Sequence, residues 1–420
     1  MPRAARSARA AARPPTPTRR LPGRRETRHP VPETARVGVR WPVRGKRSPR
    51  WAYDIPGMNP MAQRPSLPSG DPSTQRDPAP GMTAIASALA NLYGYHVRPV
   101  HWGTQSPMRA GGEDPLDGVS AFPSPSGEHW HYVTYGLTEL YEGEASFPFQ
   151  PGVSGFGFEL TFRLARLPGE DAPSWPVLML QRLARYVFRS ANVFRSGDHM
   201  ALNAPMGDRP SAIEGALFTL DPELKPLDTA RGEVRFLQVV GITADELEAV
   251  KDWRCEGFLE LMSRRNPQLV TDLRRPSLMH DPVFAHACRE GARQEGSSHG
   301  SSFASMVRWE ETNRGLELTV GAIAVPDLLR ALRLRLPFNR PFRLHGRRGS
   351  VRFVPGLSAG WAQEGRELVL HVPWDAAAAL AEALAPRRGR YECHAFPGLK
   401  VVVRPTDVRG PRGELVRVIG

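Results

Sequence analysis

The sequence predicts an α+β protein of two domains with mixed or antiparallel sheets, preceded by a disordered tail. The chain has 420 residues, which is enough for two domains of about 100–200 residues each. Stretches that alternate apolar and polar residues, as strands do, are mixed irregularly with stretches of helical spacing. A segment rich in Gly and Ser, residues 289–302, separates two such ranges and has the composition of a linker.

The first 81 residues have no hydrophobic period and are dense in Arg, Pro and Ala. Such a segment cannot bury enough apolar surface to offset its ordering entropy, so we expect residues 1–81 to be disordered. Residues 1–50 hold 15 Lys or Arg against two acids, which accounts for the whole formal net charge of +13. Nucleic acid is therefore expected to bind only through this tail, because the rest of the chain is formally neutral.

An alternative is that translation starts downstream of the tail. Met58, Met61 and Met82 are candidate starts, and an Arg, Pro and Ala bias can reflect coding composition alone. In that case the residues before that start are not part of the protein.

In the first predicted domain, residues 82–288, local patterns predict the elements in order. An Ala- and Leu-rich stretch at 83–93 predicts a helix. Alternation predicts strands at 129–138 and 155–166, each with one buried face. Apolar residues at helical spacing predict a helix over 177–190. Further along, the patterns predict strands at 234–240 and 268–274, a helix that starts with a capping box at Thr243 and Glu246, and a short helix at 257–263.

The second predicted domain covers residues 303–420. Its strand candidates are 316–323, 343–354, 368–372 and 400–403. One helix is expected over 376–384, with Asp375 as the N-cap.

Two stretches of the first domain carry a resemblance to a known family. Residues 128–138 read EHWHYVTYGLT and residues 154–164 read SGFGFELTFRL, and together they resemble the Suppressor of fused family. The resemblance covers roughly residues 82–285, including FLQVVG at 236–241 and LVTDLRR at 269–275, and continues more weakly over 316–405. It implies the family's two-domain fold, a binding role without catalysis, and no cofactor.

The resemblance also implies a partner site. In animal members the corresponding loop, with the groove between the two domains, is similar to a peptide clamp. A segment of a Gli-type zinc-finger factor is added there as a strand. Tyr141 matches the tyrosine of that region. The insert that follows here has aromatic rings that could anchor a peptide and acids that could steer it. The expected partner-binding residues are Tyr141, Glu142, Glu144, Phe147 and Phe149.

Two readings of this insert stay open. The aromatic rings could instead fold back onto the core beneath a long loop. Pro151 replaces the aspartate that animal members carry before the second signature stretch, so a Gli-type partner is not expected.

The high Arg, Ala, Gly and Pro content indicates a bacterial member. Because bacterial relatives resemble immunity proteins, neutralisation of a toxin domain is an alternative function.

A metal-dependent enzyme is the contrasting possibility. His129 and His131 alternate on a predicted strand, and His199 could complete a site with them. No tightly spaced fourth ligand, nucleophile elbow or P-loop accompanies them, so packing within a sheet is the favoured interpretation. We therefore expect no enzyme and no metal.

Two further features bear on location. The three cysteines are odd in number and widely separated, which favours a reducing cytoplasm over a disulfide framework. No run of 18 apolar residues occurs, so no membrane association is expected.

Overall fold

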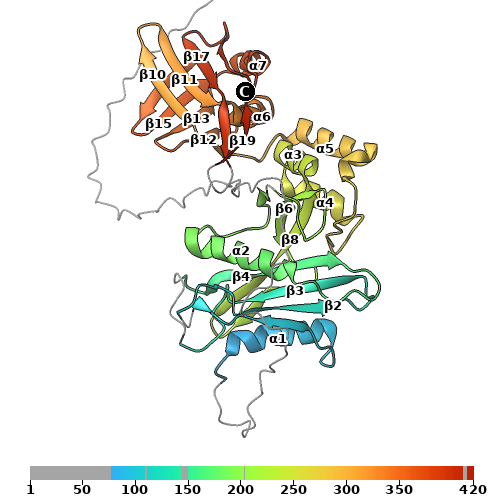
Figure 1. Cartoon of the computed structure of the whole chain (residues 1–420). Coiled ribbons are helices and arrows are strands. Elements are labelled where there is room, and N and C mark those ends of the chain that lie inside the picture. The colour runs from blue at the N-terminus through green and yellow to red at the C-terminus, as the bar shows by residue number, and fades with distance from the viewer. Residues whose placement is uncertain (1–76, 109–110, 144–149, 203, 410–413) are drawn as a thin grey trace, which may run out of the picture. The chain divides into compact units, whose positions relative to one another are not determined.

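The computed structural model describes residues 77–420 except 109–110, 144–149, 203 and 410–413 (Figure 1). The predicted tail lies outside the described residues up to residue 76, and its last two residues already belong to the first helix. The architecture is α+β with mixed sheets, as predicted. The division at residues 289–302 into two domains stays a prediction.

An eight-stranded sheet lies in the first range of the chain, residues 82–288. Its strand order is β1-β2-β3-β4-β8-β6-β5, and β7 also pairs with β8. Among the strand pairs that the described residues form in this sheet, β4·β8 is parallel and the others are antiparallel. The strands are β1 Val100–Gly103, β2 Gly118–Pro123, β3 His129–Tyr135, β4 Val153–Ala165, β5 His199–Ala201, β6 Ile213–Leu220, β7 Leu227–Thr229 and β8 Gly232–Thr243.

Helices cover both faces of this sheet, so the prediction of one buried face for β3 and β4 is wrong. All seven residues of β3 are buried. Trp130 and Tyr132 pack in the cluster that includes α2 (Trp175–Ser190), whereas Val133 and Tyr135 pack with α1 (Pro80–Tyr93). Figure 1 shows the two helices on opposite sides of the sheet. The alternation arose because buried polar side chains alternate with the aromatic ones, namely His129, His131 and Thr134.

A group of helices follows β8. It consists of α3 Ala244–Asp252, α4 Cys255–Ser263, the short helix η2 Leu278–His280, and α5 Pro282–Glu295. The capping box at Thr243 and Glu246 is confirmed.

The strand predicted at 268–274 is wrong, since this segment makes only an isolated bridge between Leu164 and Thr271. Side chains satisfy its backbone in place of a ladder. The Gln238 amide donates to the carbonyls of Gln268 and Leu269 at 2.9 and 3.0 Å, and Asn266 bonds both the N–H and the C=O of Val270.

After α5 the chain forms three smaller sheets, with orders β10-β11-β17-β16, β14-β15-β13-β12-β9 and β18-β19. Their strands are β9 Ser301–Phe303, β10 Val307–Thr312, β11 Gly315–Gly321, β12 Phe342–His345, β13 Ser350–Pro355, β14 Gly360–Glu364, β15 Glu367–Val372, β16 Gly389–Glu392, β17 Leu399–Arg404, β18 Thr406–Arg409 and β19 Leu415–Ile419. The helices are η3 Ala322–Ala324, α6 Val325–Leu334, η4 Leu336–Phe338 and α7 Trp374–Ala383.

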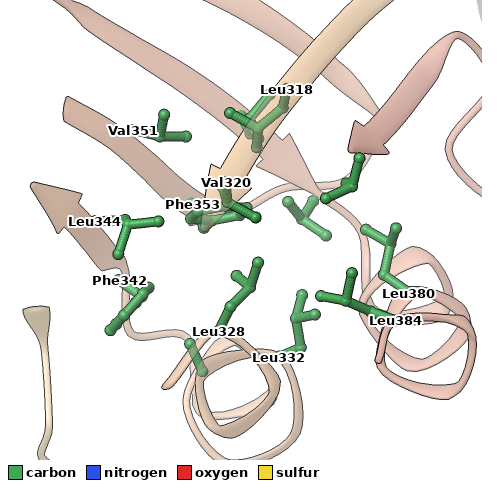
Figure 2. Packing of buried hydrophobic residues seen from close by; sticks show 14 of the residues in the cluster. Leu318, Val320, Leu328, Leu332, Phe342, Leu344, Val351, Phe353, Leu380 and Leu384 are labelled. Atoms are coloured by element: carbon green, nitrogen blue, oxygen red, sulfur yellow. The ribbon is translucent and has the colours of Figure 1, made fainter. Parts of the chain in front are cut away.

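The two larger sheets and the helices α6 and α7 enclose one apolar core. Figure 2 shows Leu318 and Val320 of β11 facing Phe353 of β13, with Leu328 and Leu332 of α6 packed below them. The strands predicted at 316–323, 368–372 and 400–403 are confirmed. The stretch 343–354 is a hairpin rather than one strand, and the N-cap of α7 is Pro373 rather than Asp375.

Candidate partner-binding site

The turn after β3 is built around a buried carboxylate. Glu159 of β4 has no exposed surface, and its Oε1 accepts the backbone N–H groups of Gly136, Leu137 and Thr138 at 3.0–3.1 Å. The hydroxyls of Thr134 and Thr138 donate to the same carboxylate at 2.6 and 2.7 Å. Burial raises the pKa of Glu159 to about 7, and these hydrogen bonds oppose that rise. The Glu159 carboxylate therefore holds the backbone of the turn that leads to Tyr141 in place.

Helix α1 fixes the next residues. The N–H groups of Gly81 and Met82 both donate to the carbonyl of Leu140, and Glu142 N–H donates to Pro78 C=O. A Cβ at Gly81 would lie 2.1 Å from the carbonyl oxygen of Glu139, so only glycine permits this close approach. The helix start and the segment 139–142 thus hold each other in place.

Tyr141 is half-buried and packs against the apolar cluster beneath α1. Glu142 next to it is exposed. The other three predicted contact residues, Glu144, Phe147 and Phe149, lie outside the described residues. Tyr141 consequently has both a core contact and an accessible part, which leaves its role in binding a prediction.

The predicted histidine residues do not converge. His129 and His131 lie on β3, whereas His199 lies on β5, and three strands of the sheet separate β3 from β5. At about 4.8 Å per strand this is roughly 19 Å. Among the described residues, no group of three or more His, Cys, Asp or Glu is arranged to hold a metal ion.

His131 belongs instead to a buried network of paired charges. Arg163 of β4 has no exposed surface and makes a two-pronged ion pair with Asp221, Nη1 to Oδ2 at 2.7 Å and Nη2 to Oδ1 at 3.0 Å. His131 Nε2 lies 3.1 Å from the same carboxylate, so it must carry the proton and donate it. Its Nδ1 then accepts the hydroxyl of Tyr93 at 2.6 Å.

Burial governs the protonation of this network. It lowers the pKa of His131, and it lowers the pKa of His129 to about 4. Burial alone would raise the pKa of Asp221, but the His131 hydrogen bond and the Arg163 guanidinium hold it well below its usual range. The four residues joined by these bonds each pair with another of the four, and His129 is not among them, so we assign the network a structural role.

The predicted linker, 289–302, is not an unattached segment. Residues up to Glu295 are helical in α5. Beyond it, Ser297 N–H donates to Leu334 C=O at 2.5 Å and its hydroxyl donates to Lys251 C=O at 2.6 Å, so this one residue bonds to both α6 and α3. Ser298 N–H donates to Trp253 C=O at 2.7 Å.

One arginine of α6 forms ion pairs between the second range, residues 303–420, and the first. Arg330 contacts Glu248 at 2.5 Å and Asp252 at 2.6 Å, both on α3, and pairs with Asp327 of its own helix at 2.5 Å. His299 is buried nearby, with its ring 5.5 Å from the ring of His199 on β5. Local sequence patterns gave no sign of these residues, because each acts through a partner far away in the chain.

A polar depression of about 300 Å³ lies at this junction, and we call it the junction hollow. Its lining comes from both ranges: Arg254, Glu256, Glu295, Ser298, Arg335 and Arg340. Glu295 accepts from Arg254 and from the indole N–H of Trp253. Arg335 and Arg340 both donate to the carbonyl of Ser297 at 3.0 and 3.3 Å.

The two predicted parts of the partner site lie toward opposite ends of β8. Glu139, two residues before Tyr141, pairs with Arg231 at 2.7 Å just before β8 begins, whereas the junction hollow lies beyond α3, which follows the end of β8. A 12-residue strand is roughly 40 Å long. The structure therefore does not bring Tyr141 into the junction hollow.

The fold and the site define a class, that of α+β proteins with mixed sheets and paired, buried charges. Residues 112–276 match the family model of the Suppressor of fused protein. The Suppressor of fused homologs of Homo sapiens and Mus musculus are each 39% identical over 249 residues, which is 56% of this chain and 51% of each relative. The crystal structure of Drosophila Suppressor of Fused is similar in fold, with a TM-score of 0.68 at 23% identity, over 80% of this chain and 99% of that one.

The chain is similar to Suppressor of fused proteins over these residues, as the signature stretches predicted. It spans about half the length of the curated relatives it matches. Both relatives are animal proteins, and they lend no support to the predicted bacterial origin. Among the described helices, none combines the length and the apolarity needed to cross a bilayer.

Proposed function

We propose that this chain is a non-catalytic protein-binding module that holds a segment of a partner protein in the groove between its two predicted domains. The observation that carries the proposal is the junction hollow, because residues on both sides of the predicted boundary line it. A partner that contacts both sides recognises the folded arrangement rather than one element.

The chemistry of the junction hollow suits a peptide. Its guanidinium and carboxylate groups are already held by neighbours, namely Glu295 by Arg254 and Trp253, and two arginines by the Ser297 carbonyl. Groups fixed in advance lose little entropy when a partner binds. A peptide segment carries donors and acceptors of both kinds, so it can bond to such a mixed lining.

The segment of Tyr141 and Glu142 is proposed as a second contact, together with Glu144, Phe147 and Phe149. Because it lies toward the other end of β8, a partner that uses both regions must extend along the sheet. The two contacts can therefore be tested separately.

The experiment is an affinity capture from native lysate with the full chain as bait, compared across single variants. Arg340→Ala alters the junction hollow, Tyr141→Ala alters the second contact, and Arg388→Ala removes an exposed charge elsewhere. We expect one stoichiometric protein that is retained by Arg388→Ala and lost with Arg340→Ala. Retention by every variant, with unchanged melting temperatures, would refute both contacts.

Two alternative functions were predicted from the sequence, a toxin-neutralising role and a metal-dependent enzyme. A toxin-neutralising role remains a prediction that the same capture tests, since the retained protein would be a toxin domain. A metal-dependent enzyme built on His129, His131 and His199 is not proposed, because β3 and β5 hold these residues apart.

A further inference from the structure

A hairpin in the second range presents arginines on a fixed loop. β12 and β13 pair with His345 opposite Ser350, which leaves the four residues Gly346-Arg347-Arg348-Gly349 as the loop. Gly346 N–H donates to Gly349 C=O at 2.9 Å, and Ser350 N–H donates to Arg366 C=O at 3.1 Å. The loop is thereby joined to the turn between β14 and β15.

Both glycines are required where they stand. A Cβ at Gly349 would lie 2.6 Å from the carbonyl oxygen of Arg366 and 2.6 Å from the ring of Trp309. A Cβ at Gly346 would lie 2.8 Å from that of Val307. The loop is thus pressed against the sheet, and its two arginines are exposed at the tip.

This region encloses a depression of about 480 Å³, which we call the hairpin hollow. Arg343, Glu364 and Glu367 line it together with the hairpin residues and Arg366. Phe303 of β9 adjoins it with 52% of its surface exposed, and its ring stacks on His345 at 5.0 Å. The hairpin hollow therefore has a charged interior and one aromatic side.

The acids of the hairpin hollow are already neutralised. Glu367 accepts from Arg343, Arg352 and the hydroxyl of Ser350, and Glu364 pairs with Arg352 at 2.8 Å. Arg347, Arg348 and Arg366 make no ion pair or side-chain hydrogen bond with any described residue. Three guanidinium groups therefore stand in excess within one small area, although the chain beyond residue 50 is formally neutral.

An excess of guanidinium groups points to an oxyanion ligand. Arginine binds carboxylates and phosphates through two parallel N–H bonds. A volume of this size fits a few residues of a peptide. Nucleic acid fits less well, because a phosphate backbone needs an extended basic track and the rim here carries two carboxylates. We propose that the β12–β13 hairpin and the β14–β15 turn bind an acidic or phosphorylated peptide segment of a protein partner.

The test measures binding of short labelled peptides to the full chain by fluorescence anisotropy. The probes are a Glu/Ser peptide, the same peptide with phosphoserine, a neutral Gln/Ser peptide, and a single-stranded oligonucleotide of similar length. The variant Arg347→Ala/Arg348→Ala/Arg366→Ala removes the three guanidinium groups. Arg314→Ala/Arg388→Ala/Arg390→Ala removes the same charge from exposed positions in the same range and is the matched control.

We expect an anionic peptide to bind, to weaken about tenfold or more in the hairpin variant, and to change less than about twofold in the control. Because every variant keeps the basic tail, a loss confined to the hairpin variant comes from the hairpin. An equal loss in both variants, no binding of either anionic peptide, or tighter binding of the oligonucleotide would overturn the proposal. Unchanged thermal melting of both variants establishes that the exposed substitutions leave the fold intact.

Discussion

The interiors of the two ranges of this chain differ in the side chains that they bury. Among the described charged and histidine residues, those without any exposed area are His131, Glu159, Arg163 and Glu246, and all lie before residue 250. The core of the second range is an apolar cluster of Leu, Val, Ala and Phe side chains (Figure 2). A buried pair is strongly destabilising only when one partner is lost, whereas an apolar core weakens in proportion to the volume removed. The first interior should therefore respond more strongly to charge and pH than the second, which should respond mainly to packing.

The largest expected effect comes from breaking the buried network. Arg163→Met leaves Asp221 buried without its main partner and should lower the free energy of unfolding by about 3–5 kcal/mol. Chemical denaturation measures this. The matched control is Arg235→Met on β8, whose side chain is 58% exposed and which should change stability by less than about 1 kcal/mol. Similar small losses in both variants would mean that the buried pair stabilises nothing.

Removing volume from the second core should cost nearly as much but without any pH dependence. Leu318→Ala deletes a fully buried side chain of β11 and should lower the free energy of unfolding by about 2–5 kcal/mol, equally at pH 7 and pH 5. Leu415→Ala on β19, where the side chain is 54% exposed, is the control and should cost far less. A loss for Leu318→Ala that changes strongly with pH would contradict the comparison.

The pH dependence itself is the third test. An unfolded histidine gains a proton below about pH 6.5, whereas burial lowers the pKa of His129 in the folded chain to about 4. Neutral, buried His129 therefore contributes fully to the free energy of unfolding above pH 6.5. This contribution is lost as the pH falls toward 4, by about 1–2 kcal/mol between pH 7 and pH 5. Denaturation of His129→Gln at both pH values should show a shallower slope than the wild type, while Leu318→Ala keeps the wild-type slope.

The smallest effect concerns helix ends. Thr243 and Glu246 form the capping box of α3, so Thr243→Ala should cost about 1 kcal/mol. α7 begins after Pro373 without a side-chain cap bond, and Asp375 lies within its first turn. Asp375→Ala should therefore cost only about 0.3–1 kcal/mol through the helix dipole. An equal or larger loss for Asp375→Ala would reverse this order.

Local signals carried the parts of the fold that depend on neighbours in sequence. The aromatic alternation located β3 and β4, and the Thr243 and Glu246 spacing located the start of α3. α6 was missed although Pro326 and the leucines at 328 and 332 carry a helical pattern. The strand expected at 268–274 failed because the amides of Gln238 and Asn266 replace ladder bonds, a substitution that composition does not reveal.

The candidate site was harder to predict for a physical reason. Arg163 pairs with Asp221 58 positions away, and Arg330 with Glu248 82 positions away, so neither contact leaves a local trace. The Gly and Ser content of 296–302 indicated a linker, because composition records intrinsic freedom and not the bonds that remove it. The resemblance to a family supplied Tyr141, but only the fold showed that Tyr141 and the junction hollow are far apart.

The anchoring of Ser297 has a consequence for how this chain can be cut. Small polar residues usually mark sites where proteases nick a protein, since cleavage requires several residues of extended, unbonded backbone. Here Ser297 and Ser298 bond to the main chain on both sides, and Ser301 already begins β9. A protease should therefore leave this boundary intact under native conditions, although its Gly and Ser content resembles that of a cleavage site.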